Sequence, residues 1–122
     1  MTTFDELAHD YINAWNETDA TTREAAVGAL FAHDARYVDP MTIAEGHESI
    51  AATIDAVHNQ FPGFIFRLAG PVDGHHEQLR FGWELGPVNE PATIIGFDVA
   101  TLDTTGKVNA VYGFLDKVTP NA

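Results

Sequence analysis

Asp98 is a lone carboxylate within residues 92–102, a segment that otherwise has the apolar composition of a buried strand. Moving an ionised carboxylate out of water is so costly that the group usually acquires a partner or a proton. An acid of this kind in a cleft is a candidate for proton transfer. We expect Asp98 to be protonated at neutral pH if its surroundings are dry, and ionised if a cation or several hydrogen-bond donors reach it.

Two further residues could act together with Asp98. Asp39 ends an expected strand, and a carboxylate there could take a proton from a carbon next to a carbonyl group. The Tyr11 phenol and a neutral Asp98 could donate hydrogen bonds to the oxygen on which charge develops. Structural interpretations stay open: Asp before Pro40 often forms a turn, Tyr11 lies on an apolar helical stripe, and Asp98 could be a buried structural acid.

The segments that must position these residues are helices first and strands afterwards. Thr3 to Glu6 has the form of a capping box, Thr21 with Glu24 gives a second helix start that leads to Phe31, and a third helix ends before Pro62. Strands are expected over residues 35–39, 64–72, 76–85, 92–102 and 108–118. The short connectors favour antiparallel neighbours. The sequence therefore predicts one α+β domain, residues 1–122, with the helices packed on a curved sheet.

The last two expected strands are apolar on both faces. Phe97 and Val99 alternate with Gly96 and Asp98, and residues 111–115 show the same property. One layer of helices covers only one face of a sheet, so the other face is expected to meet a second copy of the chain. This pattern predicts a homodimer through the outer sheet face.

Composition narrows the class of partner. The 122 residues carry a formal net charge of -12, which disfavours nucleic acids and anionic membrane surfaces. The absence of Cys excludes thiolate metal sites, and His75-His76 lacks a third ligand at suitable spacing, so no metal is expected. No segment has the pattern of a membrane span or a signal peptide, and a cytoplasmic protein is the default expectation.

The order of elements resembles the nuclear transport factor 2-like superfamily over nearly the whole chain. The resemblance rests on Tyr11, the run Tyr37-Val-Asp-Pro40, the helix start at residues 45–50, and the stretch from Asp98 to Val108. Within the superfamily the chain is similar to SnoaL-like polyketide cyclases and ketosteroid isomerases. The resemblance implies a cone-shaped fold, in which a curved, mostly antiparallel sheet and three helices enclose an apolar pocket. It implies no cofactor.

The isomerase resemblance also implies roles for individual residues. Asp39 would be the general base, while a protonated Asp98 and Tyr11 would form the oxyanion hole, as the corresponding groups do in ketosteroid isomerases. The indoles of Trp15 and Trp83 occupy pocket volume, so a ligand smaller or flatter than a steroid is expected. The residues expected to line the pocket are Trp15, Tyr37, Leu79, Phe81, Trp83, Ile94, Gly96, Val111 and Leu115.

These observations favour a cofactor-independent isomerase or cyclase that transfers a proton within a small apolar carbonyl compound. One alternative is a non-catalytic small-molecule-binding or dimerisation module of the same fold. Another is a dehydratase or hydrolase in which Asp98 activates water or a leaving hydroxyl. Epoxide opening by an Arg and Asp pair is disfavoured, because the corresponding segment here is Arg80-Phe-Gly82.

Overall fold

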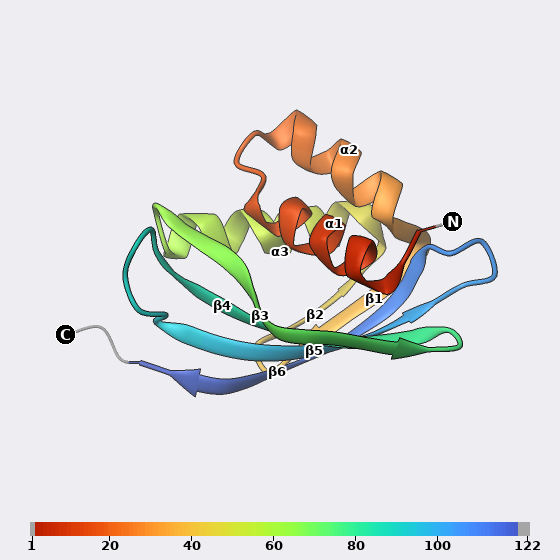
Figure 1. Ribbon diagram of the computed structural model, residues 1–122. Helices are drawn as coiled ribbons and strands as arrows, with labels where there is room; N and C mark the ends of the chain where they lie inside the picture. Colours follow the sequence, from red (N-terminus) through yellow and green to blue (C-terminus); the bar gives the residue numbers. More distant parts are fainter. Residues whose placement is uncertain (1, 120–122) are drawn as a thin grey trace.

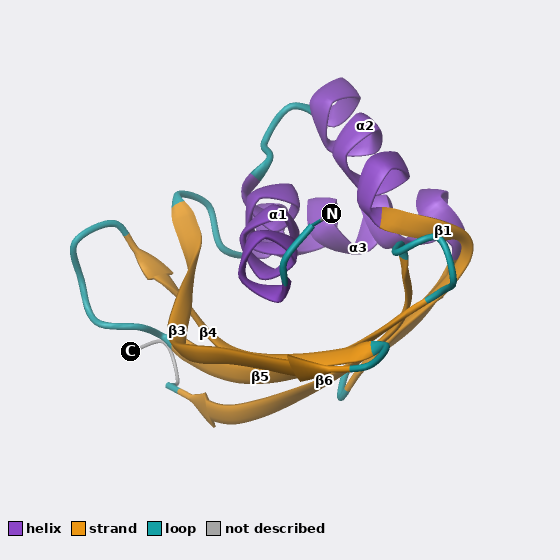
Figure 2. Cartoon of the chain, turned by 45° about the vertical axis from the view of Figure 1, so that its right-hand side comes forward, coloured by secondary structure: helices purple, strands orange, loops and turns teal. Residues whose placement is uncertain are grey.

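The helices lie together on the concave side of a single bent sheet (Figures 1 and 2). The computed structural model describes residues 2–119. Its helices are α1 (Phe4–Asn16), α2 (Ala20–Leu30) and α3 (Gly46–Gln60). Its strands are β1 (Phe31–Asp39), β2 (Thr42–Glu45), β3 (Phe64–His75), β4 (Gln78–Pro87), β5 (Ile94–Leu102) and β6 (Val108–Val118). The predicted α+β fold is confirmed.

The strand order in the sheet is β2-β1-β6-β5-β4-β3. Every neighbouring pair is antiparallel except β1 with β6, which is parallel. The last of the described strands, β6, therefore lies between β1 and β5, and it joins the β1–β2 hairpin to the β3–β5 meander. This position brings the end of β1 close to the middle of β5.

Helix α1 forms where the sequence predicts it. The Thr3 hydroxyl accepts a hydrogen bond from the backbone N–H of Glu6 at 3.1 Å and caps the first turn. The face of α1 that meets the sheet carries Leu7, Tyr11 and Trp15, all of them buried. Two of the residues of interest, Tyr11 and Trp15, thus point from α1 toward the concave face of the sheet.

In the first half of the chain, two element boundaries differ from the prediction, and one short strand was not predicted. Helix α2 is capped by Asp19, whose carboxylate accepts from the N–H and hydroxyl of Thr22 at 2.9 Å, so it starts before the predicted Thr21 signal. Phe31 begins β1 rather than continuing the helix, because its backbone is extended. The sequence prediction also missed β2, a short strand that forms a hairpin with β1 after Asp39.

Irregular register gives the sheet its curvature. Shifts in pairing occur in β3 between Ala69 and Asp73, and between β5 and β6 at Gly96 and Leu102. Bulges of this kind bend a strand and increase its twist. The concave face produced in this way receives α1 and α3, and the buried aromatic and aliphatic side chains between the layers form the core. Within residues 2–119 no helix has the length and apolar character needed to cross a membrane.

Candidate functional site

A small cavity lies between the concave face of the sheet and helices α1 and α3. Its volume is about 60 Å³, several times the space that one water molecule needs. Apolar and aromatic side chains make up most of its wall, and the charged groups among the described lining residues are the carboxylates of Asp39 and Asp98. A compact, mostly apolar ligand suits such a space.

The two carboxylates come from strands that flank β6. Asp98 on β5 pairs with Gly113 on β6, and the β1–β6 register continues to place Asp39 beside the same glycine. A Cβ atom at Gly113 would lie 3.0 Å from Asp98 Oδ1 and 3.4 Å from Asp39 Cβ. The missing side chain at position 113 is therefore what allows both acids to occupy the same end of the cavity.

Both oxygens of Asp39 are engaged by protein donors. Oδ1 accepts from the backbone N–H groups of Met41 and Thr42, each at 2.9 Å, and Oδ2 accepts from the Tyr37 hydroxyl at 2.7 Å. Three of the roughly four lone-pair positions of a carboxylate are thus occupied. Asp39 lines the cavity and also forms the turn between β1 and β2.

Asp98 is almost completely buried, with 2% of its surface exposed. Burial raises the pKa of its carboxyl from 3.8 to about 6, although the nearby Trp83 N–H and Tyr11 hydroxyl lower it. The charge of Asp39 raises it further. This raised pKa lies close to neutral pH, so both the ionised and the protonated form of Asp98 are accessible under physiological conditions.

The two pocket tyrosines remain protonated across the physiological pH range. Burial, followed by the charge of Asp98, raises the pKa of Tyr11 well above its usual value. The pKa of Tyr37 is raised in the same way, first by burial and then by Asp98 and Asp39. Tyr37 uses its hydroxyl proton on Asp39, whereas the Tyr11 hydroxyl is available as a donor inside the cavity.

Four buried side-chain atoms within residues 2–119 have no hydrogen-bond partner, and all four belong to residues that line this cavity. They are Tyr11 Oη, Trp15 Nε1, Trp83 Nε1 and Asp98 Oδ1. Trp83 and Tyr11 lie near enough to Asp98 to lower its pKa, yet neither completes a hydrogen bond to Oδ1. An unsatisfied buried polar group costs about 1–3 kcal/mol, so their gathering in one place indicates a site built for polar contacts.

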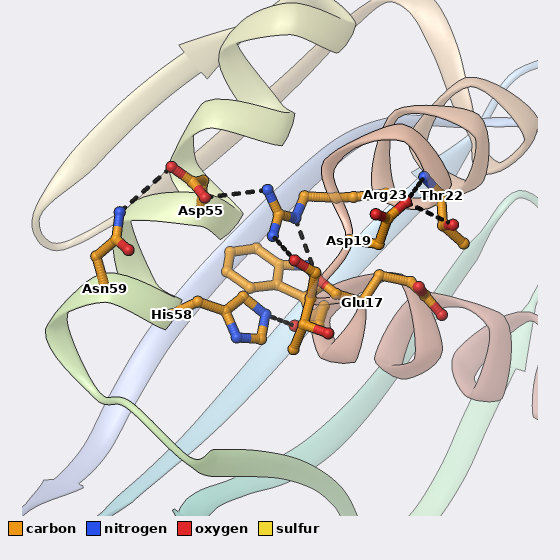
Figure 3. A network of polar contacts seen from close by, with 9 residues as sticks. Glu17, Asp19, Thr22, Arg23, Asp55, His58 and Asn59 are labelled. Atoms are coloured by element: carbon orange, nitrogen blue, oxygen red, sulfur yellow. Dashed lines mark hydrogen bonds and ion pairs between the residues drawn. The ribbon is translucent and has the colours of Figure 1, made fainter.

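Polar contacts with α2 and α3 hold the end of α1 against the cavity (Figure 3). His58 of α3 donates to the carbonyl oxygen of Trp15 at 2.7 Å. Arg23 of α2, which is 5% exposed, donates to the carbonyl oxygens of Glu17 and Thr18 and to the carboxylate of Asp55. These bonds fix the backbone at Trp15, and with it the wall that the indole forms.

The opposite wall is fixed by two close fits. Asn16 donates to the carbonyl oxygen of Phe66 at 2.9 Å and accepts from its N–H at 2.8 Å, which ties α1 to β3. The Trp83 indole of β4 packs against Gly96 of β5, where a Cβ atom would come within 3.0 Å of several indole carbons. Gly96 thus provides the room that the Trp83 indole occupies.

The structure brings together most of the residues expected at the site. Asp39, Asp98, Tyr11, Trp15, Tyr37, Trp83, Ile94 and Leu115 all line the cavity. Leu79, Phe81 and Val111 point to the same side of the sheet but are buried in the core beyond the cavity, and Gly96 lies behind Trp83. The alternation along the strands identified the correct face, but it could not locate the cavity along that face.

Sequence reasoning missed several residues of the wall. They come from α1, the β1–β2 turn, the end of α3, and strands β3 and β4: Ile12, Met41, Val57, Gln60, Phe61, Phe66 and Leu85. Val57 and Phe61 belong to the apolar stripe of α3, which was the available signal. Gln60 and Met41 carried no signal, because their contribution depends on how α3 and the turn lie over the open end of the sheet.

Comparisons with known proteins agree with this architecture. The protein-family model that describes the SnoaL-like domain matches residues 8–111 of this chain. A candidate isomerase of the SnoaL-like family from Agrobacterium tumefaciens strain C58 is 43% identical, with a TM-score of 0.91 over 96% of this chain and 100% of that chain. No protein with a curated description matches the sequence.

More distant solved structures share the fold alone. A candidate SnoaL-like polyketide cyclase from Jannaschia sp. CCS1 is 15% identical, with a TM-score of 0.73 over 93% of this chain and 85% of that chain. An NTF2-like protein of unknown function from Cytophaga hutchinsonii is 16% identical, with a TM-score of 0.69 over 95% of this chain and 92% of that chain. Similarity at this level says nothing about the reaction.

Proposed function

The chain belongs to the SnoaL-like family, and we propose that it is a cofactor-independent enzyme that moves a proton within a small apolar carbonyl compound. The name of its 43% identical relative, a candidate isomerase, is compatible with that chemistry. The proposal rests mainly on the site itself. An apolar cavity that holds one available carboxylate and one available phenol is suited to acid–base catalysis.

The observation that carries the proposal is the difference between the two acids. Asp98 is buried at the cavity wall with Oδ1 unpartnered, whereas both oxygens of Asp39 accept hydrogen bonds from neighbouring groups. A general base works best when its pKa lies near the working pH, and the pKa of Asp98 is about 6. We therefore assign proton transfer to Asp98, and to Asp39 the role of holding the β1–β2 turn and Tyr37.

In the proposed reaction, ionised Asp98 removes a proton from the carbon next to the substrate carbonyl. The electron pair of that C–H bond moves toward the carbonyl oxygen, which becomes an enolate. The Tyr11 hydroxyl donates a hydrogen bond to this oxygen and stabilises its charge. In an isomerisation, the substrate carries a β,γ double bond, and protonated Asp98 returns the proton to the γ-carbon while the double bond moves next to the carbonyl group. In a cyclisation, the enolate carbon attacks a second carbonyl group of the substrate, and the alkoxide that forms takes the proton from Asp98.

Incubation in D₂O tests the proposal without knowledge of the natural substrate. Enones of the 3-oxo-Δ5 type and simple β-keto compounds are incubated with the chain, and deuterium incorporation next to the carbonyl is followed by NMR. Incorporation faster than in buffer alone is the expected result. Incorporation at the rate of buffer alone for every compound would instead favour a non-catalytic binding module of the same fold.

Asp39→Asn is expected to change kcat/KM by less than about tenfold, because loss of a true general base costs about 10²-fold or more. The Asn carbonyl can still accept from Met41 and Thr42, so the turn is retained. The measurement is kcat/KM for the best compound of the D₂O panel. A loss of the same size as that caused by Asp98→Asn would show that Asp39 is the base, as the isomerase resemblance implies.

We also propose that two copies associate through the outer face of the sheet. Tyr112 and Phe114 on β6 are 44% and 57% exposed, and they pair across the outer face with Val99 and Phe97 of β5. A contiguous apolar surface of this kind is unusual on a monomer. The opposite face of the sheet is already covered by the helices, so the outer face is the one available for an isologous contact.

Phe114→Asp is expected to convert the dimer to a monomer, because it places a charge at the centre of this apolar surface. Light scattering coupled to size-exclusion chromatography at micromolar concentration measures the change. Val88→Asp is the matched control, since Val88 is similarly exposed at 55% but lies in the β4–β5 loop. A monomeric mass for the unaltered chain would contradict the proposal.

A further inference from the structure

Two of the unpartnered buried atoms are indole N–H groups. Trp15 Nε1 and Trp83 Nε1 belong to side chains that are 4% and 9% exposed, and both line the cavity. An indole nitrogen can only donate a hydrogen bond, whatever the pH. The tryptophans therefore do more than fill volume: each presents a fixed donor that water does not reach from outside.

The two donors approach the same polar group from different walls. Trp15 comes from α1 and lies beside the Tyr11 hydroxyl, while Trp83 comes from β4 and lies beside Asp98. Phe66 packs against both indoles, with ring centroids 5.4 Å from each. The donors thus flank the pair formed by Tyr11 and Asp98, which in the proposed reaction contact the substrate.

We propose that the indole N–H groups of Trp15 and Trp83 bind two acceptor oxygens of the substrate, and that the substrate class is a compact 1,3-dicarbonyl compound or its enol. The inference rests on the proposed function, because it places the acidic carbon of that substrate next to Asp98. A 1,3-dicarbonyl compound carries its acidic C–H group between two acceptor oxygens. This arrangement matches the cavity, in which the indole N–H groups of Trp15 and Trp83 flank the Asp98 carboxylate.

Size and charge agree with this class. The cavity volume of about 60 Å³ favours a compact molecule, and the lining contains two carboxylates and no Lys or Arg among the described residues. A neutral diketone therefore suits the site better than a carboxylic acid or a phosphate ester. The uncharged donors are strong enough to hold carbonyl oxygens, and they do not require a charged ligand.

The indole N–H signals of the chain provide a direct test. The sequence has two tryptophans, and both line the cavity, so a ¹H–¹⁵N correlation spectrum contains two indole signals. Trp15→Phe and Trp83→Phe assign them by the loss of one signal each. Pentane-2,4-dione at millimolar concentration is expected to move both signals downfield, whereas pentan-2-one, with one carbonyl group, is expected to move at most one.

The same variants test the contribution of each donor to binding. Trp83→Phe is expected to weaken binding of the dione roughly three- to tenfold and to leave binding of the monoketone nearly unchanged. Phe66→Leu is the matched control, because it alters the same wall without removing a donor, and it is expected to affect both ligands equally. Titration followed by NMR gives both dissociation constants.

The inference is overturned if the dione moves neither signal or only one, or if the monoketone moves both to the same extent. These results need no turnover, so they are independent of the D₂O experiment. Indole shifts without deuterium exchange would support the ligand class and contradict the proposed reaction. Exchange of a 3-oxo-Δ5 enone, with no indole shift on addition of the dione, would support the reaction and contradict the ligand class.

Discussion

Asp98→Asn is expected to lower kcat/KM for proton exchange by on the order of 10²–10⁴-fold. The amide has nearly the same shape as the carboxyl, but it cannot accept a proton from carbon. In the unaltered chain, kcat/KM should fall as the pH decreases through about 6, because protonation of Asp98 removes the base. The residual activity of the variant should lack this acidic limb.

A surface carboxylate provides the matched control for this variant. Asp10 lies on α1 and is exposed, so Asp10→Asn makes the same change in net charge outside the cavity. It should retain both the rate and the pH profile of the unaltered chain. An Asp98→Asn variant that folds and keeps the acidic limb would remove Asp98 from the role of base.

The same buried carboxyl is expected to make the folded chain less stable at neutral pH than at low pH. Its pKa is raised on folding, so the protonated form is favoured in the folded state. The corresponding stability is fully present below the ordinary pKa of 3.8 and is lost as the pH rises through about 6. The loss amounts to about 3 kcal/mol, from a shift of about two units at 1.36 kcal/mol each.

Denaturant unfolding of the unaltered chain and of Asp98→Asn, from pH 4 to pH 8, measures this effect. The difference in free energy of unfolding between the two should grow in favour of the variant as the pH rises from about 4 to about 6, and it should stay constant above that pH. Asp19 and Asp103, whose pKa values are lowered by hydrogen bonds, contribute in the opposite direction but equally in both proteins. A difference that does not vary with pH would contradict the raised pKa of Asp98.

Much of the fold followed from local patterns in the sequence. The capping residues and apolar stripes located the helices, and the alternation in residues 92–102 and 108–118 located the strands that carry the site. The start of β1 was misplaced, because Phe31 continues the apolar stripe of α2 while its backbone is already extended. The strand β2 was missed, because four residues are too few to show a period.

The residues that gather around the cavity were largely predictable from the sequence, and the contacts that each of them makes were less so. Asp98 stood out as a charge in an apolar segment, and Asp39 and Tyr11 were found through resemblance. The three hydrogen bonds that occupy Asp39 depend on the turn that follows it and on Tyr37, which no local pattern specifies. The donor function of the two indoles was invisible too, because it arises from atoms left without partners once the layers have packed.

The position of β6 between β1 and β5 has a consequence for the order of folding. Asp39 and Asp98 are 59 residues apart in the sequence, and the strand that aligns them, β6, follows both of them along the chain. Until β6 pairs with both neighbours, Gly113 cannot separate the two acids and the cavity has no complete floor. The helices and the β3–β5 meander can form from nearer contacts, whereas the pairing of β6 with β1, which brings the two acids together, requires the most distant ones and is expected to be completed late.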